Sequence, residues 1–353
     1  MIKYIYIERG KHMIKIIVDT LGADRGYSVM VDGAIQAINK NDDIHIIFVG
    51  PKEKIEEELK KYTFNSNNVE IINATDEITC NDKPTEAIKR KLDSSLVKSF
   101  DLLRENDDIN CLVSAGSTGA ILTGAVLKIG RIKGVKRPAF CPILPTMVPG
   151  KIIAICDSGA NADCDAHYLQ QFGIMGSLYL NAAYNIDKPK VALLNIGTEE
   201  EKGDTLRKQT YQLLKQTNNI NFVGNMESRD LLTGAYDLVV CDGFSGNVLL
   251  KSTEGACLEM LKLLKKTFTK NFKNKLGALL LKKDIYDIKK FMDYNNYGGA
   301  VMLGVNKTII KGHGSTKASS IFHSINLAYK IEINNLREKI ADEIKNNTLE
   351  ENN

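Results

Sequence analysis

The chain has 353 residues, of which 43% are hydrophobic and 25% are charged, and a formal net charge of +4. This is the composition of an ordinary globular protein that is long enough for one large domain or two. No apolar stretch approaches the roughly 20 residues that a membrane-spanning helix needs, which excludes a transmembrane protein.

The cysteines and the N-terminus indicate a reducing compartment. The seven cysteines are scattered, without a CxxC pair: Cys80, Cys111, Cys141, Cys156, Cys164, Cys241 and Cys257. Residues 1–12 carry four charges and no apolar core of a signal peptide, and Met13 opens a run that looks like a second start. We therefore expect a cytoplasmic protein without a disulfide framework, with residues 1–12 as an extension outside the fold.

Apolar runs that end in polar turns recur along the chain, and helical segments follow them. The runs predicted as strands are 14–18, 44–49, 69–73, 111–114, 152–156, 191–195, 238–241 and 308–311. Continuous apolar runs are typical of buried parallel strands, and their alternation with helices predicts a mostly parallel sheet covered on both faces.

The stretch 152–165 is the most informative of these units. An apolar run ends on Asp157, a turn containing Asn161 follows, and a helical pattern begins near Tyr168. Ligands of open α/β sheets bind beyond the carboxyl ends of the strands, where a helix N-terminus can also bind an anion. The alternative is that Asp163 or Asp165 only caps the helix and Asp157 only ends the strand.

Other strand ends carry similar polar turns. They contribute Ser114, Gly116, Ser117, Thr118, Gly119, Asn195, Gly197, Asp242, Gly243, Ser245, Gly246, Asn247 and His313. None matches a nucleotide P-loop or a dinucleotide fingerprint, and glycines in such turns are often only conformational. His313 is either a general acid or base or a polar loop residue. We find no cluster of metal ligands and no nucleophile elbow, so we expect a reaction that needs no cofactor or metal.

As a set, these blocks resemble the PlsX family, the acyl-[acyl carrier protein]:phosphate acyltransferases. The resemblance covers about residues 13–335 and is carried by the blocks 19–24, 81–84, 91–95, 114–120, 157–161, 171–176, 193–197, 202–203, 242–247, 297–300 and 313–314. The sequence departs from the family pattern at Thr20, Leu21 and Ala23 in the first block, at Ser117 where Asn is common, and at Asp204 where Asn is frequent.

The resemblance implies that a fatty acyl group passes from acyl carrier protein to inorganic phosphate. The fold it implies is a three-layer αβα sandwich with a mostly parallel, doubly wound sheet, like those of isocitrate and isopropylmalate dehydrogenases and related to phosphotransacetylases. We expect His313, Asp157, Asn161, Asp242 and Asn247 to act in catalysis and the other turn residues to bind substrate or phosphate. The catalytic residues are expected to share one cleft with Ser114, Gly116, Ser117, Thr118 and Ser245. The implied partners are a second copy of the chain and a downstream membrane glycerol-3-phosphate acyltransferase, with no nucleic acid.

Two other classes of function stay open at this point. One is a relative with the same layered fold, such as a phosphotransacetylase acting on acyl-CoA; a decarboxylating dehydrogenase is disfavoured, because no Asp metal cluster is present. The other is a basic adaptor without enzymatic activity, supported only by the lysines near residue 270.

Basic and amphipathic segments predict two docking surfaces. Lys202, Arg207 and Lys251 are candidates to dock the acidic carrier protein, although they are equally explained as solvated charges. Residues 260–283 carry eight lysines and no acid. Leu261, Leu264, Phe268, Phe272 and Leu276 recur at spacings of three and four, which predicts one apolar helical face. We expect 256–290 to form a protruding amphipathic helical hairpin on an anionic membrane, with contacts by Leu261, Leu264, Phe268, Phe272, Leu279 and Leu280. The alternative is a core helix with a lysine-covered outer face.

The expected organisation is therefore one acyltransferase domain over 13–335, followed by a charged tail over 336–353. The protein is expected in the cytoplasm, peripherally associated with the membrane.

Overall fold

The computed structural model describes residues 13–291 and 297–351, so the extension expected over 1–12 lies outside the described residues. Contacts divide the described chain into two compact units. Unit 1 comprises residues 13–129 and 307–333, and unit 2 comprises 130–291, 297–306 and 334–351. Each unit is a three-layer α/β structure, as expected. The single domain expected over 13–335 stays a prediction, because contacts alone do not decide whether the units fold independently.

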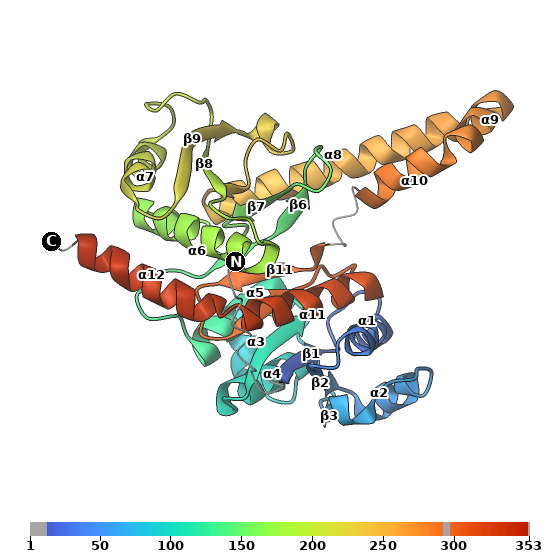
Figure 1. Ribbon diagram of the computed structural model, residues 1–353. Helices are drawn as coiled ribbons and strands as arrows, with labels where there is room; N and C mark the ends of the chain where they lie inside the picture. Colours follow the sequence, from blue (N-terminus) through green and yellow to red (C-terminus); the bar gives the residue numbers. More distant parts are fainter. Residues whose placement is uncertain (1–12, 292–296, 352–353) are drawn as a thin grey trace, which may run out of the picture. The chain divides into compact units, whose positions relative to one another are not determined.

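Unit 1 is built on five parallel strands in the order β3-β2-β1-β4-β12. They are β1 (Ile14–Asp19), β2 (Ile44–Gly50), β3 (Val69–Asn73), β4 (Ile109–Ser114) and β12 (Thr308–Lys311). The helices are α1 (Tyr27–Lys40), α2 (Lys52–Leu59), α3 (Pro84–Arg90), α4 (Ser95–Glu105), α5 (Thr118–Gly124) and α11 (Ala318–Ile333). Helices α1 and α11 pack together on one face of the sheet, and α4 covers the other (Figure 1).

Unit 2 contains a second sheet in the order β6-β7-β10-β8-β9. Its strands are β6 (Ile143–Pro145), β7 (Ile152–Cys156), β8 (Lys190–Asn195), β9 (Asn221–Glu227) and β10 (Leu238–Val240), and only β6 runs antiparallel. Unit 2 also contains β5 (Ala139–Cys141) and β11 (Ala300–Leu303), which pair antiparallel with each other and do not belong to this sheet.

The described helices of unit 2 are α6 (Ala166–Tyr184), α7 (Thr205–Gln216), α8 (Gly243–Thr269), α9 (Phe272–Leu280), α10 (Lys282–Phe291) and α12 (Leu336–Glu351). Of these, α6 and the start of α8 lie on opposite faces of the sheet. Successive side chains of β10 point to opposite faces of the sheet. Leu238 packs against α6, whereas Val239 belongs to a core cluster that includes Leu249 of α8.

Helix α6 is apolar on most sides because it is buried on most sides. It packs against strands β7 and β10 and against helices α7 and α12. The segment expected as a charged tail forms α12, which has a buried apolar side: Leu336, Ile340 and Ile344 recur every four residues and are at most 2% exposed. Burial within unit 2 accounts for α6, so this helix carries no argument for a dimer.

The expected helical hairpin is present, but its helices break where we expected one continuous apolar face. Figure 1 shows α8 extending away from the rest of unit 2, with α9 at its far end. Helix α8 ends at Thr269, and the Asn271 side chain caps α9 by accepting a hydrogen bond from the Asn274 N–H (2.9 Å). The expectation that Leu261 to Leu276 share one helical face is therefore wrong, because a polar cap interrupts the helix between them.

The first turn of α8 packs so closely on the loop after β7 that position 246 has no room for a side chain. A Cβ built at Gly246 would lie 1.9 Å from the Asp157 carbonyl oxygen and 2.8 Å from the Cys241 sulfur. At Gly255 in the same helix, such a Cβ would meet nothing within 4 Å in the described chain apart from its two neighbours and the nearby backbone of α8 itself.

This pair of glycines gives a matched test of the packing. We expect Gly246→Ala to lower the free energy of unfolding by about 3 kcal/mol or more, since overpacking outweighs the gain in helix propensity. Gly255→Ala should instead raise it by up to about 1 kcal/mol. Urea unfolding of both variants measures the difference, and equal effects would contradict the close approach.

Candidate functional site

The carboxylate of Asp19 joins three segments at the carboxyl edge of the unit 1 sheet. It accepts hydrogen bonds from the hydroxyls of Ser95 (2.5 Å) and Ser114 (2.7 Å) and from the Leu21 N–H (3.3 Å). Asp19 is 1% exposed, and burial raises its pKa to about 6 against the opposing effect of these donors. The end of β1, the loop after β4 and the start of α4 are thereby held together.

Glycines let these loops approach closely. Gly22 has a φ of +86°, and a Cβ there would lie 2.7 Å from the Cα of Gly116. The N–H of Gly312 donates to the Ser114 carbonyl (2.8 Å), which adds the end of β12. Three strand ends of unit 1 therefore converge, as the sequence predicted.

The 114–119 loop contains two kinds of residue. Ser114 is fully buried, and its hydroxyl donates to Asp19 and accepts from the Gly116 N–H (3.1 Å). These two residues hold the loop in place. Ser117, Thr118 and Gly119 are half-buried at the start of α5, where the first backbone N–H groups of a helix have no intrahelical acceptor.

His313 is half-buried in the loop after β12. The Ser315 backbone N–H donates to its Nδ1 (3.2 Å), and the Ser315 hydroxyl lies 2.8 Å from the same atom. A backbone N–H can only donate, so Nδ1 is the acceptor and the neutral ring carries its proton on Nε2. His313 is thus oriented as a hydrogen-bond donor through Nε2.

In unit 2 the corresponding centre is Asp157 at the end of β7. Its carboxylate accepts hydrogen bonds from the backbone N–H groups of Phe140 (2.9 Å), Ala160 (3.1 Å) and Asn161 (2.7 Å) and from the Asn161 side-chain amide (2.9 Å). Burial raises the pKa of Asp157 to about 6, while these donors oppose the increase. The Asn161 carbonyl then accepts from the Gly243 N–H (2.7 Å), which ties the loop to α8.

Arg207 bridges the N-termini of two helices. Asp204 caps α7, accepting from the Arg207 N–H (2.9 Å), and Asp242 caps α8, accepting from the Ser245 N–H (2.8 Å). The Arg207 guanidinium pairs with both aspartates and donates to the Ser245 hydroxyl (3.1 Å). Its side chain is 16% exposed, so Arg207 belongs to this network and not to an outer basic rim.

A hollow of about 420 Å³ opens beside this network. It is lined by Ala162, Asp163, Cys164, Asp204, Leu206, Arg207, Asp242, Phe244 and Ser245. Three carboxylates face one guanidinium there, so the hollow suits an uncharged polar group better than an anion. Burial raises the pKa of the Cys164 thiol to about 12, which leaves it a neutral part of the wall.

The loop after β8 folds back onto its own strand end. The Asn195 side chain donates to the Lys202 carbonyl (3.0 Å) and accepts from the Ile196 N–H (2.9 Å). Gly203 has a φ of +91°, and a Cβ there would lie 2.5 Å from the Asn195 oxygen. Asn195 and Gly197 thus shape the loop, while the Lys202 side chain is exposed at its end.

The structure places the other expected site residues as follows. Asn247 is exposed on the first turns of α8, and Lys251 is exposed and paired with Glu254 (2.8 Å). Of the expected membrane contacts, Leu264, Phe272, Leu279 and Leu280 are 41–81% exposed, whereas Leu261 and Phe268 are half-buried. Asp165 caps α6 by accepting from the Tyr168 N–H (3.1 Å), as one of the two interpretations expected.

Within each unit, the expected residues gather at the carboxyl ends of the strands. Ser114, Gly116, Ser117, Thr118 and His313 do so in unit 1, and Asp157, Asn161, Asp242, Ser245 and Asn247 in unit 2. The expectation that the residues of both groups line one cleft stays a prediction. Sequence reasoning missed Asp19, Ser95 and Asp204, and the signal for Asp19 was the same as for Asp157: an aspartate directly after an apolar strand.

The chain is a layered α/β protein that carries its polar loops at the strand ends, and its fold is shared with phosphotransacetylases. A phosphotransacetylase from Streptococcus pyogenes is similar in structure, with a TM-score of 0.62 and 16% identity over 92% of this chain and 97% of that one. At this identity the likeness shows the fold alone.

Sequence comparisons show the family. A model described as "Fatty acid synthesis protein" matches residues 14–339. A phosphate acyltransferase of Clostridium acetobutylicum is 44% identical over 330 residues, covering 94% of this chain and 98% of its own length. One of Bacillus subtilis is 41% identical over 338 residues, covering 96% and 100%. The chain belongs to this family, the PlsX phosphate acyltransferases, and is an acyltransferase enzyme, which sets aside the non-enzymatic adaptor.

The raised pKa values of Asp19 and Asp157 can be tested by titration. In protein with ¹³C-labelled aspartate side chains, we expect the signals lost in Asp157→Asn and in Asp19→Asn to titrate near pH 6. Asp108 is a control, because its pair with Lys15 lowers its pKa. Since the folded-state pKa is raised, each buried aspartate contributes stability that is present below about pH 4 and lost as pH rises through 6. Titration of both signals near pH 4 would contradict their desolvation.

Proposed function

We propose that this enzyme transfers a fatty acyl group from acyl carrier protein to inorganic phosphate, forming an acyl phosphate. The observation that carries the proposal is membership of the phosphate acyltransferase family over residues 14–339. The site supports it, because its residues are donors and acceptors on strand-end loops, as a reaction between two bound substrates requires.

The proposed chemistry is direct attack of a phosphate oxygen on the thioester carbon. A new C–O bond forms, the tetrahedral oxyanion collapses, and the C–S bond breaks to release the carrier thiolate, which takes up a proton. A thiol with a pKa of about 8.5 is a good leaving group, so no strong acid is needed. Positioning of phosphate and donors aimed at the oxyanion provide the acceleration.

We assign phosphate binding to the loops of unit 1. The backbone N–H groups at Ser117, Thr118 and Gly119 are suited to phosphate oxygens, and the Nε2–H of His313 donates to phosphate or to the oxyanion. Ser114 and Gly116 position this loop through Asp19.

The loops of unit 2 supply a second set of polar groups for a substrate. The hollow beside Arg207 carries more carboxylates than guanidinium groups, which favours an uncharged polar group over an anion. Arg207, Asp242 and Ser245 fix the start of α8, and Asp157 with Asn161 fixes the loop against it.

The exposed lysines support a docking role for the acidic carrier protein. Lys202 lies on the rim of the folded loop after β8, and Lys251 lies two turns into α8. Arg207, which we also expected to dock the carrier, instead fixes the site from within.

A donor assay tests the function. Acyl phosphate formation is measured with palmitoyl-acyl carrier protein and with palmitoyl-CoA, each with and without phosphate. We expect kcat/KM for the carrier-bound donor to be at least tenfold higher. Lys202→Glu should raise KM for the carrier-bound donor and leave KM for phosphate nearly unchanged. Preference for the CoA donor would make the chain phosphotransacetylase-like, and an unaltered KM would reject docking at Lys202.

We further propose that the enzyme works at the cytoplasmic membrane surface. No helix in residues 13–291 or 297–351 is long and apolar enough to cross a membrane. Helix α9 nevertheless exposes Phe272 (81%), Leu279 (64%) and Leu280 (81%) beside the run of lysines. This combination favours an interfacial position on anionic lipid, from which acyl phosphate passes to a membrane glycerol-3-phosphate acyltransferase.

Vesicle co-sedimentation tests the membrane proposal. We expect wild type to bind anionic vesicles more than zwitterionic ones, and Leu280→Glu or a Lys262/Lys266/Lys270→Glu variant to bind several-fold less. Val223→Glu is a matched control, because Val223 is also exposed (42%) but lies on β9, away from α8 to α10. Equal binding to anionic and zwitterionic vesicles, with no loss of binding in either hairpin variant, would contradict the proposal.

Finally, we propose a homodimer, supported by the apolar side chains that α8 exposes, among them Met260 and Leu263 (58% each). A single 39.2 kDa species in sedimentation at micromolar concentration would contradict it.

A further inference from the structure

The loop that precedes β5 in unit 2 is strongly basic. Residues 109–156 contain six lysines and arginines and no aspartate or glutamate. Four of the six, Arg131, Lys133, Lys136 and Arg137, lie close together in the sequence and are exposed. We call residues 131–137 the basic loop. A surface with this charge favours a negatively charged partner.

Neighbouring segments of unit 2 hold the backbone of the basic loop in place. The side chain of Gln171 on α6 donates to the Gly134 carbonyl (3.0 Å) and accepts from the Lys136 N–H (2.8 Å). The Asn306 side chain donates to the Arg131 carbonyl (3.1 Å). Because the backbone is already fixed, less conformational entropy is lost when a partner binds than with a mobile segment.

The four cations of the loop have different surroundings. The Arg131 guanidinium donates to the Lys136 carbonyl, so Arg131 helps to hold the loop together. The Arg137 guanidinium lies over the ring of Tyr168, 5.4 Å from its centroid, in a cation–π contact. No acid of the described chain forms an ion pair with Lys133, Lys136 or Arg137. The charges of these three residues are therefore available to a partner.

The basic loop adjoins the Asp157 loop of the candidate site. Arg137 is followed by Pro138, whose carbonyl accepts a hydrogen bond from the Asn161 side chain (2.7 Å). Two residues further on, the Phe140 N–H donates to the Asp157 carboxylate (2.9 Å). A partner bound on the basic loop would therefore lie next to the polar strand-end groups of unit 2.

The side chains of the loop favour an acidic protein over a lipid surface. Its apolar residues, Ile132 and Val135, are only 5% and 4% exposed. Binding in a membrane interface draws on buried apolar area as well as on charge, and the basic loop has no apolar side chain to insert. Charge without apolar area is suited to the acidic surface of another protein.

We infer that the basic loop docks the acidic carrier protein that bears the acyl thioester, through the three cations that form no ion pair. The inference rests on the proposed function, which takes this protein as the acyl donor. The loop is a denser group of cations than the two lysines assigned above, because Lys202 directly follows three glutamates and Lys251 pairs with Glu254.

Charge reversal tests the docking surface. We compare a Lys133→Glu/Lys136→Glu variant with a Lys54→Glu/Lys60→Glu control, which makes the same change in net charge at exposed lysines of α2 and its C-terminal end in unit 1. At low salt, we expect the loop variant to raise KM for palmitoyl-acyl carrier protein at least tenfold, with kcat and KM for phosphate within twofold of wild type. The control should stay within twofold throughout. At an ionic strength of about 1 M, where the Debye length is about 3 Å, the loop variant should differ from wild type less than threefold.

A second measurement does not depend on turnover. Binding of fluorescein-labelled carrier protein without an acyl group is followed by fluorescence anisotropy, and we expect Kd to be at least tenfold higher for the loop variant. Equal affinity of wild type and loop variant would overturn the inference. Loss of binding to anionic vesicles with unchanged carrier binding would also overturn it and would make the loop a lipid contact. If wild type made no acyl phosphate from any carrier-bound donor, the proposed function would fail, and the anisotropy result would still decide whether the loop docks the carrier.

Discussion

The loops of unit 2 depend on one buried carboxylate, that of Asp157. Its desolvation is unfavourable, as the pKa of about 6 shows, and four N–H donors from Phe140, Ala160 and Asn161 oppose this cost. Because the buried carboxylate needs all four hydrogen bonds, the loop that supplies them is held in one conformation. Through the Asn161 carbonyl and the Gly243 N–H, that conformation also fixes where α8 begins.

In unit 1 a buried aspartate also holds the strand-end loops together, but its hydrogen-bond partners differ. Asp19 is also buried at a strand end, but hydroxyl groups of Ser95 and Ser114 satisfy it in place of backbone amides. In both units the carboxylate holds loops and does not project into open space, so its first contribution to chemistry is positioning. Thr118 and His313 nearby are half-buried, and they are among the groups that we propose to contact substrate.

The sequence predicted features with local signals and missed those that depend on distant partners. Buried parallel strands such as Ile44–Gly50 are continuous apolar runs, whereas β5 and β6 have three residues each, too few to show a period. Arg207 looked like a surface cation because its partners Asp242 and Ser245 lie 35 and 38 residues away. The helical wheel across 261–276 failed because one asparagine cap at Asn271 outweighs an apolar period.

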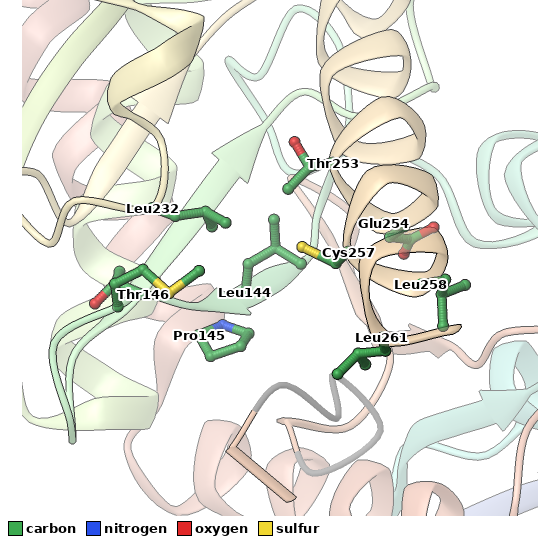
Figure 2. A pocket seen from close by; sticks show the side chains of 10 residues that line it. Leu144, Pro145, Thr146, Leu232, Thr253, Glu254, Cys257, Leu258 and Leu261 are labelled. Atoms are coloured by element: carbon green, nitrogen blue, oxygen red, sulfur yellow. The ribbon is translucent and has the colours of Figure 1, made fainter. Parts of the chain in front are cut away.

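Helix α8 explains why the site and the apolar surface belong to one chain segment. Its first turn is fixed at the reacting end by Asp242 and by the close approach of Gly246 to Asp157. Its middle lines a small apolar hollow with Leu144 and Leu232 (Figure 2), and its far end leads to the exposed leucines of α9. A 27-residue helix whose first turn is fixed by Asp242 therefore joins the polar loops of unit 2 to an apolar surface. Because a helix rises about 1.5 Å per residue, the hydrogen bonds at its start also set how far from these loops that surface lies.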